Sequence, residues 1–185
     1  MRGGYTETRK KMSIEIDITT GDSGWRAAKP LLTSVWPPDG VKSLPQDHIA
    51  FAPPDLRVTI DLDWDTVCHV GITRRTGTWN GRKVIIGGIG SVATREDVRG
   101  RGYATLAINA AIHTLTEERG TDFGMLFCEP HHAAFYEKLG WQTFNGTVYA
   151  EQSGGRTPFT ALSPYVFKIK RLLREGTIDL CGLPW

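Results

Sequence analysis

A glycine- and arginine-rich segment at residues 91–105 is the part of the sequence best suited to chemistry. Its centre reads Arg99-Gly100-Arg101-Gly102-Tyr103-Ala104. Glycines permit a tight turn and a close approach of backbone N–H groups to a ligand, and a helix N-terminus carries partial positive charge. With the arginines, these features predict a site for a polyanion such as a pyrophosphate. Solvated arginines on an ordinary strand-to-helix turn would give the same pattern.

A second group of reactive side chains lies at residues 128–136. Glu129 follows an apolar run of strand length, where it is expected to face a bound substrate. His131 and His132 are an alternative source of a general base, or they lie at a solvated helix start. Their spacing from Cys128 matches no zinc-binding pattern, so no metal site is predicted. Tyr136 follows on a short helix, where its position alone is compatible with simple packing.

The elements that position these groups follow from hydrophobic periodicity. Alternating or continuous apolar runs of strand length predict strands at Ser13–Thr19, Leu56–Asp61, Thr66–Thr76, Lys83–Thr94, Phe123–Cys128, Trp141–Phe144 and Pro164–Ile169. The Asn80-Gly81 pair between the third and fourth runs is typical of a tight hairpin turn. The third and fourth strands, Thr66–Thr76 and Lys83–Thr94, should therefore form an antiparallel hairpin.

Apolar residues at three- and four-residue steps predict a helix from Ala104 to near Gly120. A shorter helix opens at Pro130 and stops at Gly140, with a buried side expected at Ala133, Ala134, Phe135 and Leu139. Residues 22–54 hold one or two short helices, and residues 145–163 read as a long loop. The pattern predicts one α/β domain over residues 13–185 with a mixed sheet, after a flexible tail at residues 1–12.

Composition narrows the function classes. Lys plus Arg number 22 and Asp plus Glu 20, a net charge of +2, which argues against a dedicated nucleic-acid binder. No apolar run approaches the roughly 18 residues of a membrane span. Three well-separated cysteines argue against a disulfide framework, so a cytoplasmic protein is expected.

Two motifs together resemble the GNAT acetyltransferase superfamily. Arg99-x-x-Gly102-x-Ala104 matches the family's Arg/Gln-x-x-Gly-x-Gly/Ala motif, between a strand and a long helix. The segment from Ala134 to Trp141 resembles the family's "FYEKLGF" segment. The resemblance covers about residues 56–144. It implies a GNAT fold, in which a mixed, mostly antiparallel sheet with splayed central strands is flanked by helices.

The resemblance also implies a binding site for the cosubstrate acetyl-CoA. Its pantetheine amides would pair with the backbone of Val92, Ala93 and Thr94. Its pyrophosphate would be held by the segment Arg99, Gly100, Arg101, Gly102, Tyr103, Ala104 and Thr105. Tyr136 takes the position of the residue that protonates the departing CoA thiolate. An unperturbed phenol has a pKa of about 10, somewhat above the ~8.5 of a thiol.

The second half of the chain is similar to the aminoglycoside 2′-N-acetyltransferases. The pattern Val-Ala-x-Arg-x-Asp-x-Arg-Gly occurs from Val92 to Gly100, and the tail contains Cys181 and ends on Trp185. The branch's terminal Trp meets the sugar, so the Trp185 indole and carboxylate are expected in the acceptor site. The alternative is a tail docked for stability or disordered in solution.

Two departures from that branch change the expected acceptor chemistry. The branch has a carboxylate before the Val-Ala pair, where this sequence has Gly90-Ser91, and Leu183 replaces an acidic residue near the end. Glu129 is therefore the candidate base and amine ligand. Asp63, in an acidic strand end, is a further candidate ligand, although a solvated loop explains it equally well. A smaller aminoglycoside such as kasugamycin would fit a related branch.

The sequence therefore predicts an acetyl-CoA-dependent N-acetyltransferase acting on an aminoglycoside 2′-amine, an activity that confers antibiotic resistance. Tyr136 and Glu129 are its expected catalytic residues, and Glu129, Trp185 and Asp63 contact the acceptor. The alternatives are acetylation of a polyamine or a protein N-terminus, or CoA binding without turnover. A homodimer is possible, and neither a nucleic-acid nor a membrane partner is expected.

Overall fold

The computed structural model of the protein describes residues 13–38, 48–117 and 120–185. The tail predicted at residues 1–12 lies outside the described residues. The strands are β1 (Ile14–Thr20), β2 (Leu56–Leu62), β3 (Asp65–Trp79), β4 (Arg82–Thr94), β5 (Phe123–Cys128), β6 (Gln142–Thr143), β7 (Thr147–Gln152), β8 (Gly155–Pro158), β9 (Ser163–Lys168) and β10 (Thr177–Asp179). The α-helices are α1 (Trp25–Val35), α3 (Tyr103–Glu117) and α4 (Ala133–Lys138).

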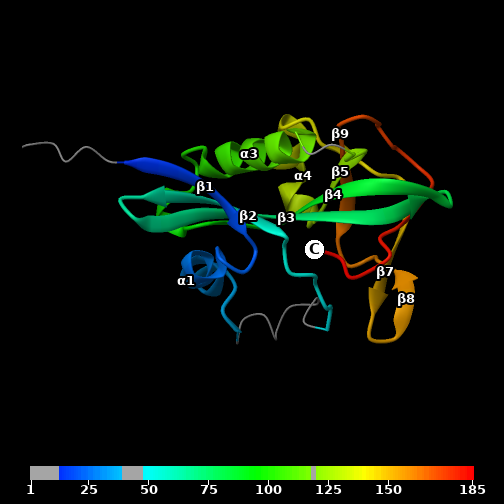
Figure 1. Cartoon of the computed structure of the whole chain (residues 1–185), viewed down its shortest axis with the longest axis horizontal. Coiled ribbons are helices and arrows are strands. Elements are labelled where there is room, and N and C mark those ends of the chain that lie inside the picture. Colours follow the sequence, from blue (N-terminus) through cyan, green and yellow to red (C-terminus); the bar gives the residue numbers. More distant parts are fainter. Residues whose placement is uncertain (1–12, 39–47, 118–119) are drawn as a thin grey trace, which may run out of the picture.

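All ten strands belong to one mixed sheet. Its main path runs β6-β9-β5-β4-β3-β10-β7-β8, and β2 and β1 extend it from β3. Only β4–β5 and β10–β7 are parallel pairs among the strands described. Helix α3 lies along one face of the sheet, α1 on the other (Figure 1). The expected α/β architecture with a mostly antiparallel sheet is therefore present.

The core lies in two clusters that meet along the sheet. Helix α3 buries Ala107, Ile108, Ala111 and Leu115 against apolar side chains of β2 and β3. These four positions repeat at three- and four-residue steps, which is the pattern that predicted the helix. The second cluster joins the start of β4 to β7, β9 and the C-terminal segment. Both clusters contain side chains of β4, so they hold in place the strand that leads into the glycine-rich segment at residues 91–105.

The segment expected to be a long loop at residues 145–163 instead contains the hairpin β7–β8. Val148 and Ala150 on β7 alternate with more exposed neighbours and are buried. Ser153 and Gly154 form the turn between the strands, whereas Thr147, Gly155 and Thr157 lie within them, so the Gly, Ser and Thr content did not indicate a loop. Strand β10 was also missed, because three residues give too short an alternation to detect.

Three of the four residues expected on the buried face of the short helix pack against the core, and the prediction is wrong at Ala134 and omits Tyr136. Among the residues of η2 (Pro130–His132) and α4, Tyr136 is the one buried side chain. Ala133, Phe135 and Leu139 pack only partly against the core, and Ala134 is exposed. The most buried position of this helix is therefore occupied by a tyrosine, which carries a hydroxyl group, and not by a purely apolar residue.

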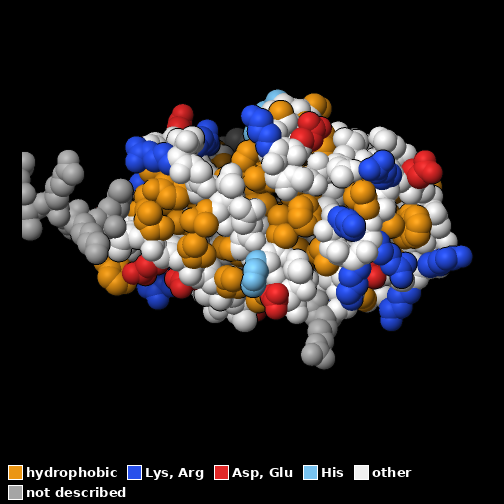
Figure 2. Space-filling view, turned by 90° about the horizontal axis from the view of Figure 1, so that it is seen from above, with side chains coloured by type: hydrophobic (Ala, Val, Ile, Leu, Met, Phe, Trp, Pro, Cys, Tyr) orange, Lys and Arg blue, Asp and Glu red, His pale blue; other side chains and the backbone are white. Residues whose placement is uncertain are grey.

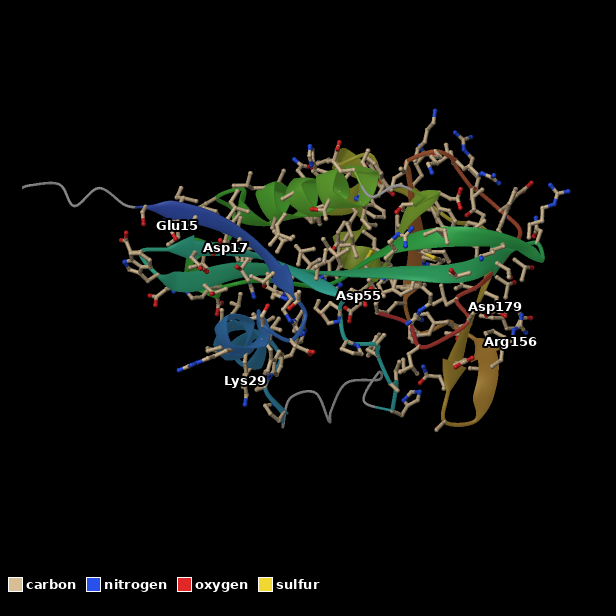
Figure 3. All side chains as sticks on the ribbon, viewed as in Figure 1. Glu15, Asp17, Lys29, Asp55, Arg156 and Asp179 are labelled. Atoms are coloured by element: carbon tan, nitrogen blue, oxygen red, sulfur yellow. The ribbon has the colours of Figure 1, made fainter. Side chains whose placement is uncertain are left out.

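The C-terminal segment is built into the sheet. Strand β10 pairs with both β3 and β7, and beyond it the backbone N–H of Ala52 donates to the Pro184 carbonyl at 2.7 Å. Arg156 of β8 forms an ion pair with Asp179 of β10 (Figure 3), and its guanidinium carbon lies 3.5 Å from the centre of the Tyr149 ring. These contacts hold the last residues of the chain near the middle of the molecule (Figure 1).

One sheet edge remains apolar on its surface. Figure 2 shows hydrophobic side chains gathered at the end of the molecule where β1 lies. Ile14, Ile16 and Ile18 of β1 are each more than 40% exposed. They face the same side as their cross-strand partners on β2, which α3 covers, so α3 stops short of this edge strand. No helix of the described residues is long and apolar enough to cross a membrane.

Candidate functional site

A cavity of about 1040 Å³ opens where β4 and β5 diverge. The two strands pair only from Ile86–Phe123 to Ile89–Leu126, and beyond that register each continues without the other. The edges of β4 and β5 that face each other therefore separate beside the cavity, while β3 and β9 still pair with their other edges. The walls come from the end of α1, the segment before β2, the β4–α3 connection, the end of β5, α4 and Trp185.

Nine of the ten residues expected to bind acetyl-CoA line this cavity. They are Val92, Ala93, Thr94, Arg99, Gly100, Gly102, Tyr103, Ala104 and Thr105. The tenth, Arg101, is exposed and is not among the lining residues. The glycine-rich turn and the start of α3 therefore face the same space as the end of β4, as the motif predicted.

The glycine-rich turn has the geometry of a cradle. Gly100 and Gly102 have φ angles of +75° and +87°, which favour glycine, and open space lies where a Cβ would stand on either. The Gly102 carbonyl accepts the first helical hydrogen bond of α3, from Leu106 at 3.0 Å. The free N–H groups of the first turn of α3 thus begin at the turn, which suits an anionic group. These residues fit the pyrophosphate of acetyl-CoA.

A β-bulge at Ser91 shapes another part of the end of the cavity that is expected to bind acetyl-CoA, called the donor end below. Ser91 has a φ angle of +48°, and the β3–β4 register shifts beside it. Its carbonyl oxygen lies 2.7 Å from Nδ1 of His69, a wholly buried residue of β3. The guanidinium of Arg57 lies 3.0 Å from the other ring nitrogen and can only donate, so Nε2 accepts and Nδ1–H donates to Ser91. His69 therefore fixes the bulge from behind.

The charge state of His69 follows from the same contacts. Burial, helped by the neighbouring Arg57 guanidinium and opposed by the hydrogen bond to Ser91, lowers the pKa of His69 to about 4. The ring is therefore neutral near pH 7, as the tautomer requires. Sequence analysis did not identify His69 or Arg57, because neither motif includes them and only the β2–β3–β4 register brings them to Ser91.

Tyr136 lines the cavity while remaining 8% exposed. Its ring makes edge contacts with Phe135 and Trp141 at centroid distances of 5.1 and 6.5 Å, which hold it in one orientation. Burial, and secondarily the nearby Cys128, raise the pKa of the phenol above its ordinary value. The hydroxyl therefore keeps its proton throughout the neutral range and is available to donate it.

Glu129, His131 and His132 line the cavity at the end of β5. The Glu129 carboxylate lies 3.2 Å from Nδ1 of His131, and the two imidazole rings lie 3.9 Å apart. Burial, with His131 next, lowers the pKa of His132, so this ring is suited to accept a proton. Burial, with Glu129 next, raises the pKa of the Cys128 thiol to about 11, which disfavours a nucleophilic thiolate.

Trp185 reaches the cavity from the opposite side. It is 7% exposed, its indole N–H donates to the Met125 carbonyl at 3.2 Å, and its ring lies 5.9 Å from that of Phe127. Its indole and backbone carbonyl occupy the space that side chains at Gly88 and Gly90 would need. Trp185 can therefore pack against β4 only because residues 88 and 90 are glycines without side chains.

Asp63 is not brought to this site. It lies in the β2–β3 turn, where its carboxylate accepts a hydrogen bond from the Ser13 N–H at 3.1 Å, and it is not among the residues that line the cavity. Trp36 and Phe51 do line the cavity, although sequence analysis did not select them. Their segment had no readable periodicity, so only the folded structure places them.

Comparison with known proteins supports the motif assignment. A family model described as an acetyltransferase (GNAT) domain matches residues 54–144. That range contains β2 to β5, α3 and α4, and thus both motifs and the donor end of the cavity. No curated protein matches the chain.

Several solved structures share the fold. Escherichia coli YhbS, a GNAT family N-acetyltransferase solved in complex with CoA, has a TM-score of 0.59 and 15% identity, covering 91% of this chain and 89% of that one. Escherichia coli ElaA gives 0.59 and 17%, covering 84% and 100%. A Lactobacillus plantarum protein described only provisionally as an N-acetyltransferase gives 0.60 and 18%, covering 85% and 99%. These likenesses confirm the expected GNAT fold.

Proposed function

We propose that this chain is an acetyl-CoA-dependent N-acetyltransferase of the GNAT superfamily, since a GNAT domain model matches residues 54–144. It would move the acetyl group of acetyl-CoA onto a primary amine bound in the β4–β5 cavity. The observation that carries this proposal is the meeting of three parts in one cavity. The Gly102 turn offers an anion cradle, Tyr136 offers a buried proton donor, and Glu129 offers a carboxylate.

The donor end is proposed to bind acetyl-CoA largely through backbone groups. The β4–β5 pairing ends at Ile89, so the edge of Val92 to Thr94 that faces away from β3 has no β5 partner and is available to the pantetheine chain. Arg99 and the first turn of α3 would hold the pyrophosphate. This binding places the thioester near the point where β4 and β5 separate.

The reaction needs a neutral amine and a protonated leaving group. The amine nitrogen forms a bond to the thioester carbonyl carbon while the carbon–sulfur bond breaks. Tyr136 donates its proton to the sulfur, and the amine gives up a proton to a base. Glu129 is the proposed base, with His132 as the alternative because its lowered pKa keeps the ring neutral. Positioning and acid–base catalysis together supply the rate.

The narrower acceptor proposal is the 2′-amine of an aminoglycoside, with antibiotic resistance as the consequence. It is supported by the motifs of the second half of the chain and by the position of Trp185 in the cavity wall. A polyamine and a protein N-terminus are the alternative amines. Binding of CoA without turnover is the remaining alternative, and the buried, protonated Tyr136 in the cavity favours an enzyme over it.

The test measures two quantities on the purified full chain. Calorimetry gives the acetyl-CoA affinity, and a thiol reagent follows CoA release in the presence of aminoglycosides, polyamines, peptides and simple amines. Acetyl-CoA binding with amine-dependent release of CoA is the expected result. Binding without release from any amine would favour the non-catalytic alternative, and absence of binding would remove the proposal.

A further inference from the structure

We infer that the acceptor is a small primary amine attached to an apolar group of about the size of an aromatic ring. This inference rests on the proposed function. The cavity has an aromatic wall, defined as Trp36, Phe51, Phe127 and Trp185. These four residues come from the end of α1, the segment before β2, the end of β5 and the C-terminal segment. The fold thus collects aromatic rings from four distant parts of the chain.

The aromatic wall is supported from behind. Phe159 is buried and lies 4.9 Å from the Phe127 ring and 6.5 Å from the Phe51 ring, both in edge contact. Phe127 in turn lies 5.9 Å from Trp185. Three rings of the wall are therefore held in register through packed neighbours, which makes the wall a preformed surface.

Two rings of the wall remain exposed although they line the cavity. Trp36 is 38% and Phe51 42% exposed. A fold gains nothing from leaving large apolar surfaces in water at the mouth of a cavity, and such surfaces mark binding sites for apolar ligands. A ring or similar apolar group on the acceptor would cover them.

The charges of the cavity favour a single amine over a polycation. Among the described residues that line it, Glu129 is the only acidic side chain. One ammonium group can pair with Glu129, but further ammonium groups would lose water beside aromatic rings without a partner. The guanidinium of Arg75 also lies 5.6 Å from the centre of the Trp185 ring, so that region already carries a cation. On this ground the cavity favours an amine on an apolar group over the aminoglycoside of the narrower proposal above and over a polyamine, and the experiment decides between them.

The experiment compares four amines on the full chain: 2-phenylethylamine, n-butylamine, spermidine and kanamycin. We expect kcat/KM for phenylethylamine to exceed each of the others at least tenfold. Trp36→Ala and Phe51→Ala should each lower that value at least fivefold and lower kcat/KM for butylamine by a smaller factor, so that the preference for phenylethylamine over butylamine shrinks. Trp64→Ala, which removes an 85% exposed ring in the β2–β3 turn outside the cavity, is the matched control and should change nothing.

The outcomes separate this inference from the proposed function. Faster turnover of kanamycin or spermidine than of phenylethylamine would overturn the inference but keep the proposed enzyme activity. Equal rates for phenylethylamine and butylamine, or no effect of the two wall variants, would also overturn it. If acetyl-CoA binds but no amine is acetylated, phenylethylamine is titrated into the complex of the protein with CoA and its binding is measured by calorimetry. Absence of binding would contradict the aromatic wall as an acceptor site. Failure to bind acetyl-CoA would contradict the proposed function itself.

Discussion

The indole of Trp185 fills the space beside Gly88 so closely that a Cβ on residue 88 would lie 2.2 Å from its Cε2 atom. Gly88→Ala must therefore displace the indole or move β4, and overpacking of this kind costs about 1–3 kcal/mol. Trp185→Ala alone should cost about 3–5 kcal/mol, since the ring is buried. In the double variant the new methyl group has room, so the two losses should not add. Urea unfolding of all four proteins gives the coupling free energy.

A coupling below about 0.5 kcal/mol would mean that the two sites act independently, as distant residues do. Gly154→Ala serves as the control, because nothing lies within 4 Å of a Cβ there. It should add its own small effect to Trp185→Ala without any coupling. The comparison therefore separates a general effect of alanine in a strand or turn from the contact with the indole.

The sequence predicted the glycine-rich segment, Glu129 and Trp185, which all contribute to the cavity lining, but it did not predict Trp36, Phe51 or His69. Arg99 and Gly102 are close in sequence and act through backbone geometry at one strand-to-helix junction, so their spacing carries the information. The aromatic wall joins Trp36, Phe51 and Trp185 across distant elements, and no local pattern records that contact. The same reason hides His69, whose role depends on the β3–β4 register at Ser91.

Gly102→Val should weaken acetyl-CoA binding strongly, because residue 102 has a φ angle of +87° and precedes the first turn of α3. A β-branched side chain is strained in that conformation and also projects into the cradle. We expect a loss of affinity of at least tenfold by calorimetry, with the fold retained by circular dichroism. Arg101→Ala is the matched control, since Arg101 belongs to the same turn but does not line the cavity. Unchanged affinity of Gly102→Val would remove this turn from the donor site.

Tyr136→Phe should lower kcat by about 10²-fold, the lower range for loss of an acid–base group, with little change in the acetyl-CoA KM. The phenylalanine keeps the edge contacts with Phe135 and Trp141, so the packing persists. Tyr165→Phe removes a hydroxyl from another buried tyrosine of the same core cluster that does not line the cavity, and it should leave kcat unchanged. A kcat of Tyr136→Phe within about twofold of wild type would assign the proton to another donor.

The buried His69 should make the protein less stable in mild acid. Its pKa is lowered to about 4 by burial, whereas an unfolded histidine has a pKa near 6.5. Between these values the unfolded state binds more protons than the folded state, so the free energy of unfolding rises with pH and falls as the pH drops from about 6.5 to 4. The difference of about 2.5 pKa units corresponds to a contribution of order 3 kcal/mol.

His69→Gln removes this titration while keeping an amide donor for the Ser91 carbonyl. The variant should lose less stability than wild type when the pH is lowered from 7 to 4.5, as measured by urea unfolding at each pH. His113→Gln, which replaces an exposed histidine on α3 that makes none of these contacts, should keep the wild-type slope. If His69→Gln also keeps that slope, His69 is not held neutral between Arg57 and Ser91. His69→Leu, which cannot donate to Ser91, should in addition raise the acetyl-CoA KM, because the bulge that shapes the donor end loses its support.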